Sequence, residues 1–272
     1  MTPTLIGLVV TGLVLMLILG ATSVFYDIGK WIYFEAIRII AVTKPLLPSR
    51  VAILKKYFFY YNRLPDKDRK RFEKRVNQFL HSKRFAGRED LVITEEMKVL
   101  ISATSVMLTF GLPMIYLSHF YKIAVYPDAY YSRINKKYHF GEVNPMLGII
   151  ILSWKSFVEG FIDPNDSRNL GLHEMAHALH FENQIRNDEY DFLNPAILAK
   201  WDRLALIEIE RINKNEDHFF RKYAGANQHE FFAVAMEYFF ETPLEFKKAL
   251  PELYTTLTHL VRQDPERLYQ LS

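Results

Sequence analysis

The segment from Asn169 to His180 reads NLGLHEMAHALH and contains the pattern H-E-x-x-H. On a helix with about 3.6 residues per turn, His173 and His177 lie one turn apart on the same face, so both imidazoles can reach one metal ion. Glu174 projects beside them, where a carboxylate can accept a proton from water activated by the metal. The pattern therefore predicts a zinc site with Glu174 as the general base.

The alternative is a chance match on an ordinary amphipathic helix. The residues between the two histidines and after them are mostly apolar, which indicates that the helix is buried. Two histidines and a glutamate inside a core need partners to offset the cost of their desolvation. This context favours the metal site over the chance match.

The amino-acid composition excludes several classes of protein and several kinds of metal ligand. The chain has 272 residues, of which 50% are hydrophobic and 15% aromatic, so it can bury the core of one large domain. Its net charge of +3 is small and dispersed along the chain, which excludes a nucleic-acid-binding protein. It has no cysteine, so disulfides and thiolate ligands are excluded and His, Asp and Glu are left as metal ligands.

The amino-terminal segment predicts a membrane anchor. Residues 1–26 carry no charged side chain, and residues 5–26 supply about the number of apolar residues that a bilayer span needs. A cleaved signal peptide is the alternative, but no Lys or Arg precedes the apolar run. Basic residues beginning at Lys30 follow it, so the sequence predicts a single-pass protein of the inner (cytoplasmic) membrane whose catalytic domain faces the cytoplasm.

This pattern divides the chain into three parts. We expect a transmembrane anchor at 1–28, an amphipathic membrane-proximal connector at 29–60 and an α+β domain that carries the H-E-x-x-H helix at 61–272. The connector could instead begin the globular core. A second uncharged run, residues 99–120, contains many polar residues and is interpreted as a buried helix that breaks near Gly111, not as a second span.

Two β-branched runs predict strands, at residues 123–127 and 147–154. The second run lies shortly before the H-E-x-x-H helix. It could line the cleft with a free edge, to which an extended peptide adds by backbone hydrogen bonds. The alternative is an interior strand without a role in substrate binding.

A catalytic zinc with two histidines needs a third protein ligand. His180 lies about 10.5 Å along the helix axis from His173, too far to bind the same ion easily, and is interpreted as a rim residue. A later apolar helix over residues 227–240 carries Glu230 and Glu237 on one face, two turns apart. One of them can bind the metal while the other accepts a hydrogen bond from a ligand histidine. Spacing alone gives Glu230 only a small lead.

Further short motifs extend over residues 64–270. They are Tyr126-Pro127, Leu152-Ser153-Trp154, the segment from Asn169 to Leu179, Trp201, Tyr223-Ala224, the segment from Glu230 to Phe240 and Gln263-Asp264-Pro265. In these motifs the chain resembles the zinc peptidase family of Mlc titration factor A, a family related to the catalytic domain of anthrax lethal factor.

The resemblance implies a zincin fold of the gluzincin type, with His173, His177 and Glu230 as zinc ligands and Glu174 as the catalytic base. It also implies that Tyr223 donates a hydrogen bond to the transition state, although a half-buried aromatic residue at a helix start is the simpler interpretation. One departure is His180, which stands where the family usually has Asp.

The sequence therefore predicts a membrane-anchored zinc metallopeptidase that hydrolyses a peptide or protein substrate. The alternative is a non-catalytic regulatory protein of the same fold, which sequesters a protein partner such as a transcriptional repressor. An open coordination position at the metal would favour the enzyme, whereas a fourth protein ligand from His180 or Glu237 would favour the regulatory protein.

Overall fold

The computed structural model describes residues 44–132, 136–162, 166–214 and 217–270, together with Gly20, Thr22 and Gly29. The helices are α2 (Pro48–Tyr57), α3 (Phe59–Arg63), α4 (Asp66–Ser82), α5 (Glu95–Thr109), α6 (Trp154–Ile162), α7 (Leu170–Gln184), α8 (Pro195–Asn213), the 3₁₀ turn η1 (Lys222–Gly225), α9 (Gln228–Glu241), α10 (Pro243–Ala249), α11 (Pro251–Val261) and α12 (Glu266–Gln270). The strands are β1 (Arg84–Gly87), β2 (Lys122–Tyr126), β3 (Tyr130–Ser132), β4 (Lys137–His139), β5 (Gly141–Asn144) and β6 (Ile149–Ser153).

Four of the strands form one mixed sheet in the order β1-β2-β6-β5. β1, β2 and β6 are parallel, and β5 runs antiparallel to β6 with Gly141 opposite Leu152. The predicted strands at 123–127 and 147–154 are confirmed as β2 and β6. β6 is an interior strand, however. The free edge that we expected at residues 147–154 therefore belongs to the neighbouring strand β5.

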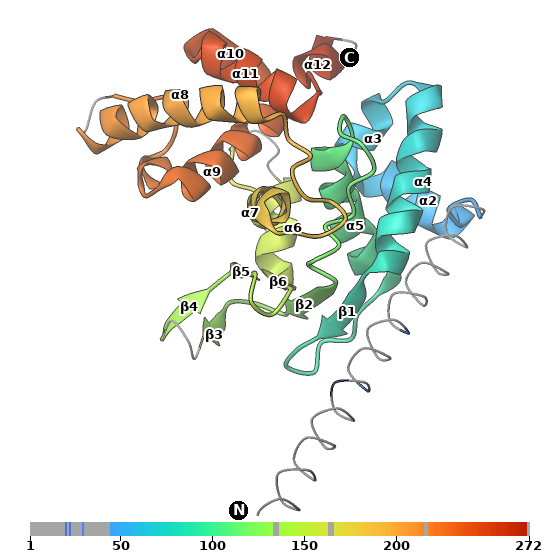
Figure 1. The fold of residues 1–272 in the computed structure, drawn as a ribbon. Helices are drawn as coiled ribbons and strands as arrows, with labels where there is room; N and C mark the ends of the chain where they lie inside the picture. The colour runs from blue at the N-terminus through green and yellow to red at the C-terminus, as the bar shows by residue number, and fades with distance from the viewer. Residues whose placement is uncertain are drawn as a thin grey trace, which may run out of the picture. The chain divides into compact units, whose positions relative to one another are not determined.

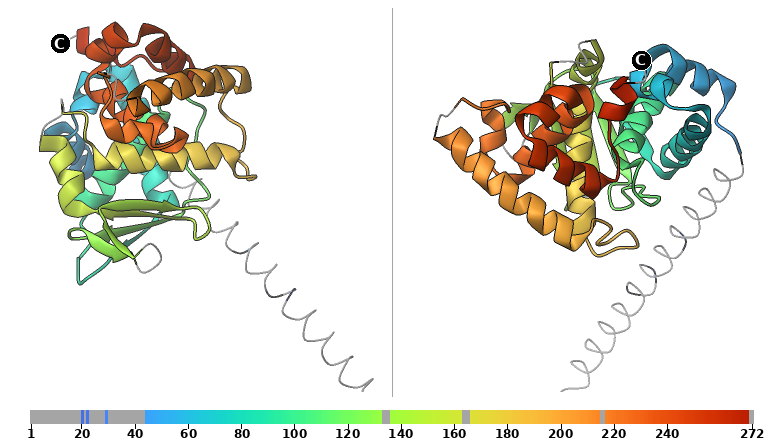
Figure 2. Two further views of the ribbon diagram at one scale, coloured as in Figure 1. Left: turned by 90° about the vertical axis from the view of Figure 1, so that its left-hand side faces the viewer. Right: turned by 90° about the horizontal axis from the view of Figure 1, so that it is seen from above.

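The helix that carries the H-E-x-x-H pattern, α7, lies at the centre of the domain. Figures 1 and 2 show α7 between the sheet on one side and α8 and α9 on the other. It packs against β5, β6, α5 and α9. Ala176 and Ala178 are fully buried, and such small side chains let neighbouring elements approach the helix closely. The motif is therefore held inside the core, with its histidine face toward α9.

The predicted buried helix within residues 99–120 is confirmed as α5, whose residues from Val99 to Thr109 are all buried. The side chain of Thr94 caps the helix by accepting a hydrogen bond from the backbone N–H of Met97 at 3.1 Å. The break comes near Gly111, where a Cβ atom would lie 2.1 Å from the backbone oxygen of Arg262. Only glycine fits this close approach of two backbone segments.

The predicted localisation, a single-pass protein of the inner membrane, is corrected. Among the residues that the structure describes, no helix has both the length and the apolar character needed to cross a membrane. The proposed span itself, residues 5–26, lies outside the described residues except for Gly20 and Thr22.

The predicted boundaries at residues 28 and 60 stay predictions. Residues 45–272 form one compact unit of the chain. Within it, α2 and α3 already contribute buried side chains to the core, among them Leu54 and Tyr61. The hydroxyl of Tyr61 on α3 donates a hydrogen bond of 2.5 Å to Glu73 on α4. This bond links α3 to α4.

Candidate metal centre

Two histidines of α7 face each other across one turn of the helix. The side-chain oxygen of Asn169 caps the helix by accepting a hydrogen bond of 3.0 Å from the backbone N–H of Leu172. Four and eight residues after this cap, the Nε2 atoms of His173 and His177 come to 3.1 Å from each other. The two rings are nearly perpendicular, at 84°. Both ring nitrogens thus point to one region of space.

Glu230 brings a carboxylate to the same place from α9. The side chain of Asn227 caps α9 by accepting a hydrogen bond of 3.0 Å from the backbone N–H of Glu230 itself. The Oε2 atom of Glu230 lies 3.1 Å from Nε2 of His173 and 3.4 Å from Nε2 of His177. One atom from each of the three residues lies within 4.8 Å of the other two, so the three could hold one metal ion.

The donor set fits a divalent metal. Nδ1 of His173 lies 2.8 Å from Glu237, so the ring proton belongs on Nδ1 and Nε2 presents a lone pair. In this neutral form the lone pair faces a second imidazole nitrogen and a carboxylate oxygen, so the three atoms need a further proton or a metal ion between them. Two imidazoles and one carboxylate are a ligand set of catalytic zinc sites. A metal ion could bind all three atoms at once.

The charges around His173 also favour a bound cation. Burial lowers the pKa of His173, but the hydrogen bonds and charges of Glu230 and Glu237 outweigh burial and raise that pKa to about 10. Burial also raises the pKa of Glu230, but hydrogen bonds from the two histidines hold it well below its usual range. The site therefore favours positive charge, which a metal cation supplies.

Glu237 orients His173 from the side away from the other ligands. Its carboxylate is 1% exposed and accepts hydrogen bonds from Nδ1 of His173 (2.8 Å), the backbone N–H of Asn169 (2.7 Å) and Arg221 (2.5 Å). The guanidinium of Arg221 offsets the buried negative charge. Of the two glutamates that the sequence left open, Glu230 thus lies beside both Nε2 atoms, whereas Glu237 lies behind His173.

Glu174 lies between α7 and the edge strand β5. Its side chain is 5% exposed, and a Cβ atom on Gly141 would lie 2.4 Å from its Oε1 atom. Burial, reinforced by the nearby carboxylate of Glu230 and partly offset by His173, raises the pKa of Glu174 to about 7. A carboxyl group with this pKa can exchange a proton near neutral pH.

Tyr223 approaches the cluster from η1. Its ring centroid lies 6.1 Å from that of His173, and the residue is 52% exposed. Burial, followed by the charge of Glu230 and a hydrogen bond to it, raises the pKa of Tyr223 to about 12. The phenol therefore stays protonated at neutral pH and can donate a hydrogen bond.

A family model described as glucose-regulated metallo-peptidase M90 matches residues 35–262. The chain belongs to this family. It is a metallopeptidase family, so membership implies a metal ion, and the structure offers this M90 member a cluster of two histidines and a glutamate.

Three relatives of this M90 member are similar to it over most of its length. Mlc titration factor A of Edwardsiella ictaluri is 27% identical over 229 residues, which cover 76% of this chain and 85% of the relative. Mlc titration factor A of Yersinia pestis is 25% identical over 223 residues, 74% of this chain and 80% of the relative. An uncharacterized protein of Synechocystis sp. is 26% identical over 262 residues, 91% and 94% of the two chains. The resemblance to the Mlc titration factor A family is confirmed, while the relation to lethal factor stays a prediction.

His180 does not join the metal cluster of this M90 member. It is 9% exposed and lies in the interior, not at an exposed rim as its position suggested. Its ring contacts His229 and Phe232 of α9, with centroids 4.8 Å and 5.2 Å away. Burial, together with the neighbouring His229 and His177, lowers the pKa of His180 to about 4.

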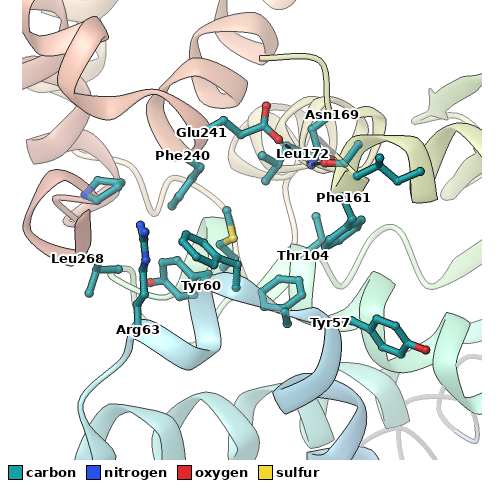
Figure 3. Close-up of a pocket in the computed structure, with 16 residues that line it drawn as sticks. Tyr57, Tyr60, Arg63, Thr104, Phe161, Asn169, Leu172, Phe240, Glu241 and Leu268 are labelled. Atoms are coloured by element: carbon teal, nitrogen blue, oxygen red, sulfur yellow. Dashed lines mark hydrogen bonds between the residues drawn. The ribbon is translucent and has the colours of Figure 1, made fainter. Parts of the chain in front are cut away.

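A cavity of about 360 Å³ lies behind the start of α7, and none of the three cluster residues lines it. Figure 3 shows Asn169 and Glu241 together at one side of it, with Arg63 and Leu268 at another. The side-chain amide of Asn169 donates to Glu241 at 2.9 Å. The cavity is therefore separate from the candidate metal centre, although it borders Asn169, which caps α7.

Replacing Glu237 with Gln is expected to weaken zinc binding by about 10- to 100-fold, because the loss of a partner that orients a ligand histidine has costs of this size. Competition with a chromogenic chelator measures the dissociation constant. Glu241→Gln is the matched control, since Glu241 is also buried on α9 but bonds to the Asn169 side chain instead of to His173. Equal losses in both variants would show that Glu237 has no special role at His173.

Proposed function

We propose that the chain is a zinc-dependent peptidase that hydrolyses peptide bonds in a peptide or protein substrate. The observation that carries the proposal is the convergence of His173, His177 and Glu230 with the carboxyl group of Glu174 beside them. Membership of the M90 family supports it.

Each side chain has a separate task in this proposal. His173, His177 and Glu230 hold the zinc ion, and Glu237 keeps the proton of His173 on Nδ1. When bound, zinc supplies Lewis-acid chemistry for water and the scissile carbonyl. Glu174, with its pKa raised to about 7, takes a proton from the attacking water and passes it to the leaving amine. Tyr223 donates a hydrogen bond to the oxyanion as its charge develops.

The edge strand β5 offers a way to hold the substrate. β5 pairs with β6 on one side, and it ends the four-stranded sheet of the described residues. Gly141, the first residue of β5, lies against the side chain of Glu174, so this end of the edge strand is close to the proposed catalytic base. An extended peptide could add to this edge by backbone hydrogen bonds and bring its scissile bond beside the metal ligands.

The regulatory alternative, sequestration of a protein partner without catalysis, is less well supported. It requires no buried general base, whereas burial here raises the pKa of Glu174 to the range that proton transfer needs. His180 and Glu237 also lie away from the position of a fourth ligand, since His180 packs on α9 and Glu237 bonds to Nδ1 of His173.

A mixed peptide library, incubated with the full chain and read by mass spectrometry, tests the proposal. We expect cleavage that stops after removal of metal by a chelator and returns with about one equivalent of zinc. A preparation that binds zinc and cleaves no peptide would overturn the proposal in favour of the regulatory alternative.

Replacing Gly141 with Ala is expected to lower kcat by about 10- to 100-fold, because displacing a catalytic group by about 1 Å has costs of this order. The new methyl group would lie 2.4 Å from Oε1 of Glu174 and would push the carboxyl group away. Kinetics on a cleaved library peptide measure the effect, while zinc content and melting temperature serve as controls. Unchanged kcat would show that the position of Glu174 against β5 is unimportant.

A further inference from the structure

Two further histidines meet beside the metal centre, where α7 crosses α9. His180 lies three residues after His177, and His229 directly precedes Glu230. Their ring centroids are 4.8 Å apart. The Nδ1 atom of each ring is buried and has no hydrogen-bond partner in the described part of the chain.

A buried polar nitrogen without a partner destabilises the folded chain, so two of them in neighbouring rings require an explanation. Both rings are packed against aromatic neighbours of the core. The ring of Phe232 meets His180 edge-on at 84°, and the ring of Phe181 stacks on His229 at 28°. The two rings are thus in contact with each other, and a ligand from outside the protein chain could supply the partner that each Nδ1 atom lacks in the described part of the chain.

The surroundings favour a cation as that partner. Asp202 on α8 is partly buried and interacts electrostatically with His229. Neutral imidazole is the commonest metal ligand among side chains, and imidazole with carboxylate suits zinc and related transition metals. A water molecule could also satisfy hydrogen bonds, whereas a cation would in addition be attracted by the carboxylate of Asp202.

We propose that His180 and His229 bind a second transition-metal dication such as Zn²⁺ beside the peptidase centre. Asp202 supplies negative charge to this site, and water completes the coordination. With two imidazole ligands in place of the three protein ligands at the first centre, the second site binds zinc more weakly. The first centre keeps its own ligands, so the second site does not depend on peptidase activity.

Zinc titration of the full chain tests the proposal, with bound metal measured by elemental analysis after equilibrium dialysis. The wild-type chain should bind two zinc ions, one tightly and one at least about 10-fold more weakly. His180→Asn and His229→Asn should each bind one. His139→Asn is the matched control: in the described part of the chain its ring also has a buried nitrogen without a hydrogen-bond partner, but it contacts Tyr130 and not a second histidine. It should still bind two.

One zinc per wild-type chain at millimolar excess, or two in both His180→Asn and His229→Asn, would overturn the second site. Retention of the first, tight zinc shows that a variant has folded. A second measurement uses no variant: with the first centre filled by zinc, and with elemental analysis showing that this zinc is retained, added Cu²⁺ should show two imidazole nitrogens in its electron paramagnetic resonance spectrum. One nitrogen or none would also overturn the proposal. Because peptide cleavage is measured separately, failure of the second site is distinguishable from failure of the proposed peptidase.

Discussion

Replacing Glu174 with Gln is expected to lower kcat by about 10²- to 10⁴-fold, the range that a positioned general acid–base contributes. Gln has nearly the same shape as Glu, so the contact with Gly141 on β5 is retained. The amide cannot accept the proton that a carboxylate with a pKa of about 7 accepts. Kinetics on a cleaved peptide measure the loss.

The variant should also retain about one tightly bound zinc and the wild-type melting temperature, because Glu174 is not among the three converging ligands. Glu142→Gln is the matched control. Glu142 is a carboxylate on β5 that bonds to the hydroxyl of Tyr130 at 2.8 Å, and its loss should change kcat by less than about 10-fold. Unchanged turnover in Glu174→Gln would remove Glu174 from the mechanism.

The second large effect is expected for Glu230→Gln, which should weaken zinc binding by more than about 100-fold. Removing a direct ligand should cost more than removing a partner that orients one, for which about 10- to 100-fold is typical. Glu230 Oε2 lies within 3.4 Å of both ligand nitrogens, and a neutral amide is a much poorer ligand at that position. Chelator competition measures zinc affinity, and peptide cleavage should be lost in parallel.

Glu237→Gln provides the comparison, because both glutamates belong to α9 and both touch His173. The account requires the larger loss at Glu230. Wild-type zinc affinity in Glu230→Gln, or a larger loss in Glu237→Gln, would mean that the third ligand has been assigned to the wrong glutamate.

That the two histidines come together could be predicted, because it depends on local helix geometry, whereas Glu230 was singled out only by the family resemblance. The H-E-x-x-H motif shows which face of α7 carries the two histidines. The caps Asn169 and Asn227 mark where α7 and α9 begin. Spacing could not choose between Glu230 and Glu237, since residues two turns apart share a face and differ only in height along the axis. The height of the metal depends on how α7 crosses α9, which is a tertiary property.

Other features lacked a local signal. Arg221 reaches Glu237 from an irregular segment before η1, and no pattern in the sequence marks it. β5 is only four residues long and half-buried throughout, so it has no alternation to reveal it as the edge strand. His180 lies on the predicted face of α7, but its burial comes from Phe232 on another helix. The prediction of membrane localisation rested on the apolar run at residues 5–26 and on the basic residues that follow it.

The proposed peptidase depends on one zinc ion that His173, His177 and Glu230 hold with a coordination position open to substrate. X-ray absorption at the zinc edge, on the full chain with one equivalent of zinc, tests it most directly. The account predicts two imidazole nitrogens and oxygen ligands at about 2.0–2.2 Å, with a coordination shell that changes when a peptide hydroxamate binds. A shell of four protein ligands that the hydroxamate leaves unchanged would mean a closed, structural site and would contradict the account.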